Sequence, residues 1–185
     1  NEMLLDTIPP AKLGADAWTE VQKAFASVKL NGSVKLQAGC LTLNGANPVE
    51  LLVNATLKGD KQSSIFIWTG AATNGFKLNY ERSSMSGFWL RRADLGLPAT
   101  SGTAITLAGG TSHVYDFFIN GCYIAISSNN QSGGTIENFT IHNSVEAGIF
   151  IIDTNDPIIQ NGFVVADDEF LVLTDLAGGF SPTAG

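Results

Sequence analysis

Four segments in the second half of the sequence read alike, and this repeat constrains the fold more than any other feature. Each has an apolar residue at the first position, then any residue, then one of Gly, Asp or Asn, then Phe, then any residue, and finally an aliphatic residue. The segments begin at Met85, Val114, Ile136 and Ile159. A second short apolar strand follows each one. A period near 22 residues predicts a solenoid, because one coil cannot bury its apolar face without a neighbouring coil.

The third position of the repeat explains how each coil turns. It holds Gly87, Asp116, Asn138 and Asn161, the residue types that best tolerate a left-handed backbone conformation. We therefore predict that these four residues stack as a structural turn ladder between two strands.

Side chains that follow the ladder should alternate between the core and the solvent. In the last segment this requires Gly162 to be an inserted residue. The predicted inward residues are then Phe88, Phe117, Phe139 and Phe163, followed by Leu90, Ile119, Ile141 and Val165.

The whole chain fits an all-β solenoid with one short helix. We expect an N-terminal extension over residues 1–15, a capping helix over 16–30, the parallel β-helix over 31–175 and a C-terminal tail over 176–185. Asp16 is the expected helix cap, since apolar residues recur after it at helical spacing. The tail offers no helix to seal the solenoid, which predicts either a shortened protein or closure by partner subunits.

The first half carries a family resemblance. Residues 16–25, 32–43, 55–60 and 64–67 resemble the opening of pectate-lyase-superfamily domains, which read as a helix, a strand pair and a "hydrophobic-x-G" rung. Cys40 stands where that family usually has an aromatic residue. The resemblance implies a right-handed parallel β-helix.

The chain looks most similar to the β-helix domains of phage tailspikes and related virion proteins. That likeness implies a homotrimer on the virion surface that contacts other virion proteins and recognises a host surface polysaccharide. A secreted protein is the alternative location. Fold alone does not fix function, so these remain expectations.

Composition narrows the choice of partner. The formal net charge is −7, and an acidic surface repels phosphate backbones, so we expect no nucleic-acid ligand. No stretch of the sequence is long and apolar enough to span a bilayer, so no membrane partner is expected either. Cys40 and Cys122 are too few for a disulfide scaffold, and we expect two buried free thiols.

The repeat also predicts an apolar stripe on the outside of the coils. Sugar rings could stack there on Trp89 and Phe118, while Arg91 and Arg92 meet acidic groups and Asn120 lies beside them. A subunit interface that a trimer would bury is the competing and simpler interpretation. The predicted outward positions are Trp89, Phe118, Thr140 and Val164, then Arg91, Asn120, His142 and Ala166.

Carboxylates recur near the second strand of the last coils. Asp153 and Asp175 lie one period apart, which predicts a separation of about 4.8 Å, and Asp156 lies nearby. Such a pair suits a retaining glycosidase or, equally, a calcium site. Ordinary turn residues are the simpler explanation.

The alternative functions are therefore a polysaccharide lyase or glycoside hydrolase and a purely structural module of a particle. The residue set of the lyases is missing from the outward positions. His113 and His142 are expected to be structural, and no cofactor other than calcium is expected.

Overall fold

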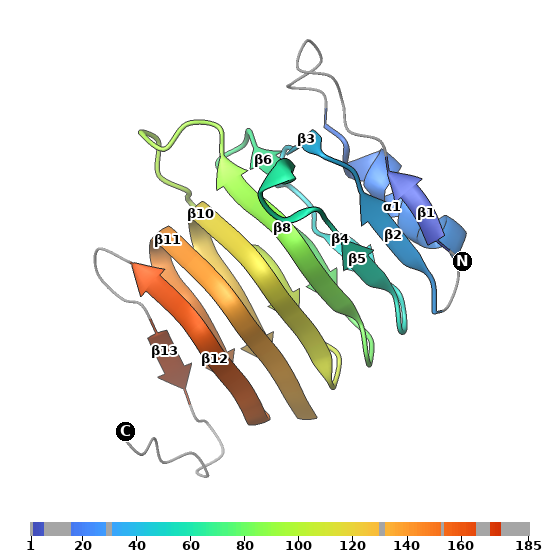
Figure 1. Cartoon of the computed structure of the whole chain (residues 1–185). Coiled ribbons are helices and arrows are strands. Elements are labelled where there is room, and N and C mark those ends of the chain that lie inside the picture. Colours follow the sequence, from blue (N-terminus) through green and yellow to red (C-terminus); the bar gives the residue numbers. More distant parts are fainter. Residues whose placement is uncertain are drawn as a thin grey trace.

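The described residues form a parallel β-solenoid of about six coils, which confirms the predicted fold class. The computed structural model describes residues 2–5, 16–28, 31–129, 132–152, 154–165 and 171–174. Figure 1 shows the coils stacked side by side from α1 (Trp18–Val28) to β12 (Asn155–Val165). The remaining strands are β1 (Glu2–Leu5), β2 (Ser33–Leu36), β3 (Gly39–Leu43), β4 (Val49–Leu51), β5 (Thr56–Lys58), β6 (Ser64–Trp68), β7 (Phe76–Leu78), β8 (Ser84–Arg92), β9 (Thr103–Leu107), β10 (Ser112–Asn129), β11 (Ser132–Ile152) and β13 (Leu171–Thr174), and a 3₁₀ turn, η2, spans Lys61–Ser63.

Each coil presents three faces, because the chain bends between successive strand segments. All strand pairs are parallel and join the same position of neighbouring coils. The first face contains β1, β2, β5 and residues 84–86, 112–115, 134–137 and 157–160; the second contains β3, β6 and residues 88–92, 117–120, 139–142 and 162–165; the third contains β4, β7, β9, residues 124–129 and 149–152, and β13.

The turn ladder lies at the corner between the first and second faces. Gly87, Asp116, Asn138 and Asn161 have φ values of 67°, 53°, 52° and 54°. The left-handed conformation predicted for them is therefore present. On either side of each ladder residue the strands stay in register, so the four residues form a column along the solenoid.

Stacked aromatic rings fill the core beside this corner. Phe88, Phe117 and Phe139 are buried, and each neighbouring pair of rings has centroids 5.7 Å apart, with interplanar angles of 7° and 13°. Parallel pairing in register forces the side chains of successive coils into this column. The inward orientation predicted for these three residues is confirmed.

The prediction for the last segment is wrong. Gly162, not Phe163, pairs with Phe139, so there is no inserted residue and the side chains of residues 163–165 point the opposite way to the prediction. Ala166 lies outside the described residues. Phe163 is 74% exposed and Val165 is 55% exposed, whereas Val164 packs against the core. The ring of Phe139 lies over Gly162, where an added Cβ would come within 2.2 Å of it.

Helix α1 covers the first coil. Its buried face consists of Val21, Ala24, Phe25 and Val28, which join the main hydrophobic cluster. Asp16 Oδ1 accepts hydrogen bonds from the backbone N–H groups of Trp18 and Asn44, both at 3.2 Å, so the predicted cap also ties the helix to the solenoid. Within the predicted N-terminal extension, β1 pairs with β2 as a further strand of the first face.

Candidate functional site: an aromatic row on the second face

An aromatic row runs along the outside of the second face. We define it as Trp89, Phe118, Thr140 and Phe163, which pair in register on four successive coils. The rings of Trp89 and Phe118 have centroids 4.8 Å apart and are tilted by 44°. Trp89, Phe118 and Thr140 are half-buried, and Phe163 is largely exposed. The rings of Trp89 and Phe118 are therefore spaced along the row by one coil of the solenoid.

A second column of side chains flanks the row. Arg91 is exposed, and Asn120 and His142 are half-buried. The His142 ring lies 5.5 Å from that of Phe118. Asn120 Oδ1 accepts a hydrogen bond of 2.7 Å from Asn143 Nδ2, which fixes the amide and leaves its NH₂ group as a donor. The structure thus places Trp89, Phe118, Arg91 and Asn120 side by side on this face, and their role in glycan binding or at a subunit interface stays a prediction.

Arg92 does not belong to this surface. It is only 7% exposed, and its guanidinium donates hydrogen bonds to the backbone carbonyls of Gly70, Ala71 and Asp94. A Cβ at Gly121 would lie 3.1 Å from Arg92 Cδ, so that glycine leaves room for the side chain. Arg92 therefore ties together the loops that follow β6 and β8. This burial does not fit the prediction that Arg92 meets ligand acids.

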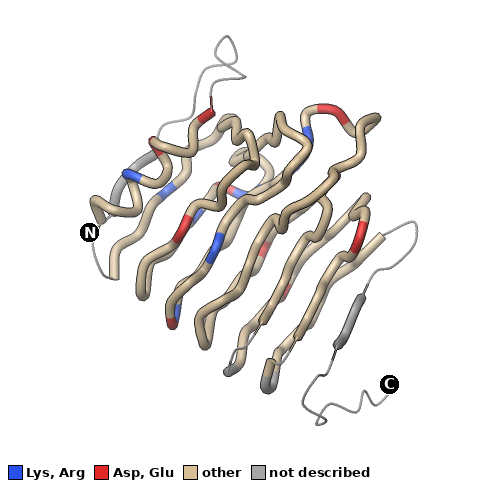
Figure 2. Tube along the Cα trace, turned by 180° about the vertical axis from the view of Figure 1, so that it is seen from behind, with Lys and Arg blue, Asp and Glu red and all other residues tan. Residues whose placement is uncertain are grey.

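Charge is distributed unevenly along the coils. From the third coil to the sixth, the two described outward columns of the second face contain no aspartate or glutamate, although the chain has 17 acidic residues. Figure 2 shows long uncharged stretches of the strands between the acidic and basic positions. These two columns therefore combine aromatic rings and uncharged polar groups with one exposed arginine, Arg91, which suits aromatic stacking and donation of hydrogen bonds to acceptor oxygens.

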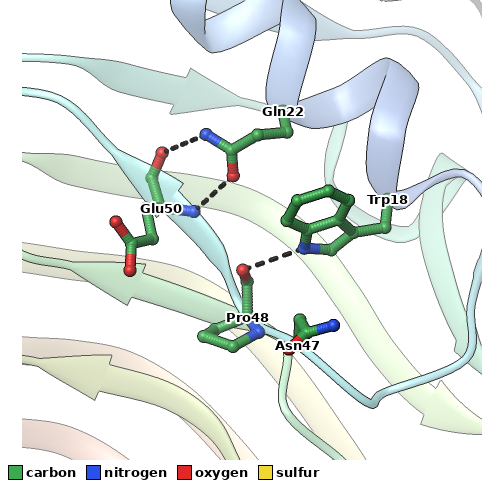
Figure 3. A pocket seen from close by; sticks show the side chains of 5 residues that line it. All are labelled: Trp18, Gln22, Asn47, Pro48 and Glu50. Atoms are coloured by element: carbon green, nitrogen blue, oxygen red, sulfur yellow. Dashed lines mark hydrogen bonds between the residues drawn. The ribbon is translucent and has the colours of Figure 1, made fainter.

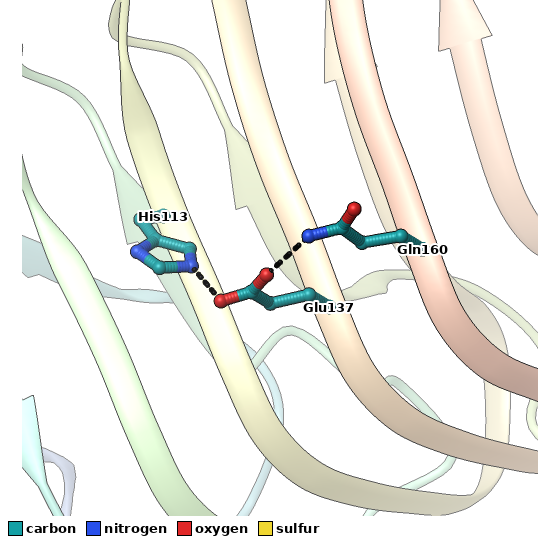
Figure 4. A network of polar contacts seen from close by, with 3 residues as sticks. All are labelled: His113, Glu137 and Gln160. Carbon is teal, nitrogen blue, oxygen red and sulfur yellow. Dashed lines mark hydrogen bonds and ion pairs between the residues drawn. The ribbon is translucent and has the colours of Figure 1, made fainter.

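A polar network spans the last three coils on the first face. His113 Nε2 lies 3.0 Å from Glu137 Oε1, and Gln160 Nε2 donates to Glu137 Oε2 at 2.6 Å (Figure 4). The Gln160 hydrogen bond is the main cause that lowers the pKa of Glu137, and His113 adds to it. Tyr115 stacks on His113 with ring centroids 4.5 Å apart. We call these four residues the first-face network.

Sequence reasoning missed most of this network. The second position of the repeat accepts any residue, because its side chain makes no contact with the core. This position holds Tyr115, Glu137 and Gln160. The available signal was their shared position, since each precedes a ladder residue and must point outward. His113 was expected to be a satisfied structural histidine, and it does have a hydrogen-bonded partner.

A hollow of about 430 Å³ lies where α1 meets β4 (Figure 3). Trp18 Nε1 donates to the Pro48 carbonyl at 2.9 Å, so the indole is fixed in place. The Gln22 amide accepts from the Glu50 N–H at 2.9 Å and donates to the Glu50 carbonyl at 3.2 Å. Both side chains are used to dock the helix, which makes this hollow part of the cap.

The predicted acidic pair falls outside the part of the chain that the structure describes. This applies to Asp153 and Asp175, and for Asp156 only the backbone position in β12 is described. The glycosidase and calcium interpretations remain predictions. Elsewhere in the described chain, no group of three or more His, Cys, Asp or Glu side chains is placed to hold a metal ion.

Both cysteines in the described chain are free thiols. Cys122 is buried as expected, and desolvation raises the pKa of its thiol to about 12. Cys40 is half-exposed, which corrects the expectation that it is buried. It lies on the outward side of the second face beside Ile65, because β3 pairs with β6 in register.

Comparisons with known proteins give no relative: no family model, no curated protein and no solved structure matches this chain. Among the described helices, none is long and apolar enough to cross a bilayer.

Proposed function

We propose that this chain recognises a host surface polysaccharide as a spike-like component of a phage virion, and that sugar rings stack on the aromatic row. The observation that carries the proposal is the pair of outward rings of Trp89 and Phe118, 4.8 Å apart on adjacent coils. Large apolar side chains on the solvent side of a sheet are otherwise difficult to explain, because exposed apolar area marks contact sites.

The chemistry of the face fits a sugar. Aromatic rings offer flat apolar surfaces to the C–H face of a pyranose. Arg91 and the NH₂ group of Asn120 supply donors for ring oxygens, hydroxyls or a carboxylate. Because the row is built on hydrogen-bonded strands, these groups are held in place before the ligand arrives, which reduces the entropic cost of binding.

The proposal includes a homotrimer that contacts other virion proteins. A trimer could use the same aromatic row as its subunit interface, and the chain would then be a structural module of the particle. Both uses are served by apolar surface, so the test must measure binding and assembly on the same variants.

The decisive test compares Trp89→Ala with Leu97→Ala. Leu97 is a matched control, because it is an apolar side chain that is 62% exposed on the loop after β8. Both proteins are screened against immobilised bacterial surface polysaccharides. Loss of one stacking ring should weaken binding by about ten-fold in Trp89→Ala only. Equal affinity of both variants for a bound polysaccharide would contradict the assignment.

Light scattering at two concentrations decides between the two uses of the row. A stable trimer in the native chain and in Trp89→Ala leaves the row available for sugar. A trimer that dissociates in Trp89→Ala and persists in Leu97→Ala assigns the row to the subunit interface, and the sugar site must then be sought elsewhere.

A further inference from the structure

The first-face network has features that a purely structural ladder does not need. Its members come from three successive coils, and both oxygens of the Glu137 carboxylate are engaged from opposite sides, by His113 and by Gln160. The side chains are nevertheless accessible: those of His113 and Glu137 are 38% and 23% exposed. Gln160 is exposed and Tyr115 is half-buried.

Several hydrogen-bonding positions of the network remain free among the described residues. A carboxylate has about four acceptor positions, and the network uses two of those of Glu137. The carbonyl oxygen of Gln160, the hydroxyl of Tyr115 and His113 Nδ1 have no partner among the described residues. Fixed donors and acceptors that point outward from a rigid sheet are what a ligand with many hydroxyl groups can use.

An aromatic platform lies directly beside these groups. Tyr115 and His113 stack with centroids 4.5 Å apart and planes 30° from parallel. The neighbours of the pair on the adjacent coils are Ser84, Ser86, Thr135 and Glu137, and all of them except Glu137 are small. A flat apolar surface next to planar polar groups fits a sugar ring, whose faces are apolar and whose edges carry hydroxyls.

The charge of the first face indicates which class of sugar can bind there. Among residues 84–86, 112–115, 134–137 and 157–160 of the first face, Glu137 is the one acidic side chain, and none is a lysine or an arginine. An anionic sugar would be repelled by this carboxylate, and the nearest lysine in the same outward column, Lys58, lies three coils away from it. We propose that the first-face network is a second glycan site, separate from the aromatic row, and that it binds neutral, hydroxyl-rich oligosaccharides.

The structure supplies a matched control for the test. Tyr123 donates from its hydroxyl to Glu146 Oε2 at 3.2 Å, so a second Tyr and Glu pair also links adjacent coils, away from the first face. The variants are Glu137→Gln and Tyr115→Ala, with Glu146→Gln and Tyr123→Ala as controls. Glu137→Gln keeps the shape of the side chain, removes its negative charge and replaces one acceptor oxygen with an NH₂ donor.

The experiment is calorimetric titration with neutral hexose and N-acetylhexosamine oligosaccharides, with a uronate and an amino-sugar oligomer as charged probes. It is run in the native chain and in Trp89→Ala. We expect neutral oligomers to bind in both, and Glu137→Gln and Tyr115→Ala to weaken this binding at least about ten-fold. Glu146→Gln and Tyr123→Ala should bind as the native chain does.

The outcomes separate this site from the aromatic row. Loss of neutral-sugar binding in Trp89→Ala would place the sugar on the aromatic row and overturn the second site. Binding of only the uronate or only the amino sugar would overturn the ligand class. Unchanged affinity in both network variants, or no neutral-sugar binding in the native chain, would show that the network only links coils.

Discussion

At the residue scale, the fold depends on single positions that accept a left-handed backbone. Asp116, Asn138 and Asn161 take this conformation without being glycine, with φ between 52° and 54°. For most residues the left-handed conformation costs about 1–2 kcal/mol. Short Asn and Asp side chains bear less of that cost, because they can hydrogen-bond locally.

Replacing Asn138 tests this account. We expect Asn138→Ala to lower the free energy of unfolding by about 1 kcal/mol and Asn138→Gly to leave it nearly unchanged, since glycine adopts positive φ freely. Urea denaturation measures both. Asn129→Ala is the control, because Asn129 is exposed at the end of β10. An equal loss in the alanine and glycine variants of Asn138 would show that its side chain, not its backbone, matters.

At the element scale, the strand segments are held by columns of like residues. The stack of Phe88, Phe117 and Phe139 runs through three coils, and its central ring contacts both neighbours. The column stops at Gly162, over which the Phe139 ring lies. The exposed Phe163 belongs to the outer column and contributes no burial to the core.

Two alanine substitutions compare these columns. Phe117→Ala should destabilise the protein by about 3–5 kcal/mol, because it removes a buried ring and leaves a cavity. Phe163→Ala should change stability by less than about 0.5 kcal/mol. Thermal or urea unfolding gives both values. If Phe163→Ala cost as much as Phe117→Ala, the register of β12 would have to be shifted by one residue.

At the scale of the whole molecule, one continuous core runs from α1 through β11. Cys122 is buried in that core, and Cys40 lies half-exposed on the second face. Solvent should therefore reach the two thiols at very different rates. The rate at which the Cys122 thiol reacts therefore measures how often its coil opens to solvent.

Thiol labelling with a disulfide reagent at pH 8 measures this. The thiolate is the reactive form, and Cys122, with a pKa of about 12, holds very little thiolate at that pH. We expect the native chain to react quickly at one thiol, Cys40, and the denatured chain at two. The Cys40→Ser variant should then show no fast phase. Fast labelling of Cys122 in that variant would mean that its coil opens readily.

The sequence allowed the coils, the turn ladder and the inward Phe residues to be predicted, because burial and positive φ restrict those positions strongly. It did not allow the position of Arg92 to be predicted. Strand alternation points Arg92 inward, but its charge suggested exposure, and only the carbonyls around it explain the burial. Gly162 was ambiguous because a glycine fits both an insertion and a regular strand position. The first-face network lies where the repeat accepts any residue, so the pattern gave no chemical signal.

The paired hydrogen bonds between Gln22 and Glu50 protect one end of the third face from pairing with another strand. A parallel sheet that ends on an open strand can seed a fibre, because the next molecule adds its own strand to the free backbone groups. At β4 the amide of Gln22 already occupies the N–H and the carbonyl of Glu50, in the way that a neighbouring strand would. One side chain thus imitates a peptide unit, and the third face cannot template polymerisation from its helical end.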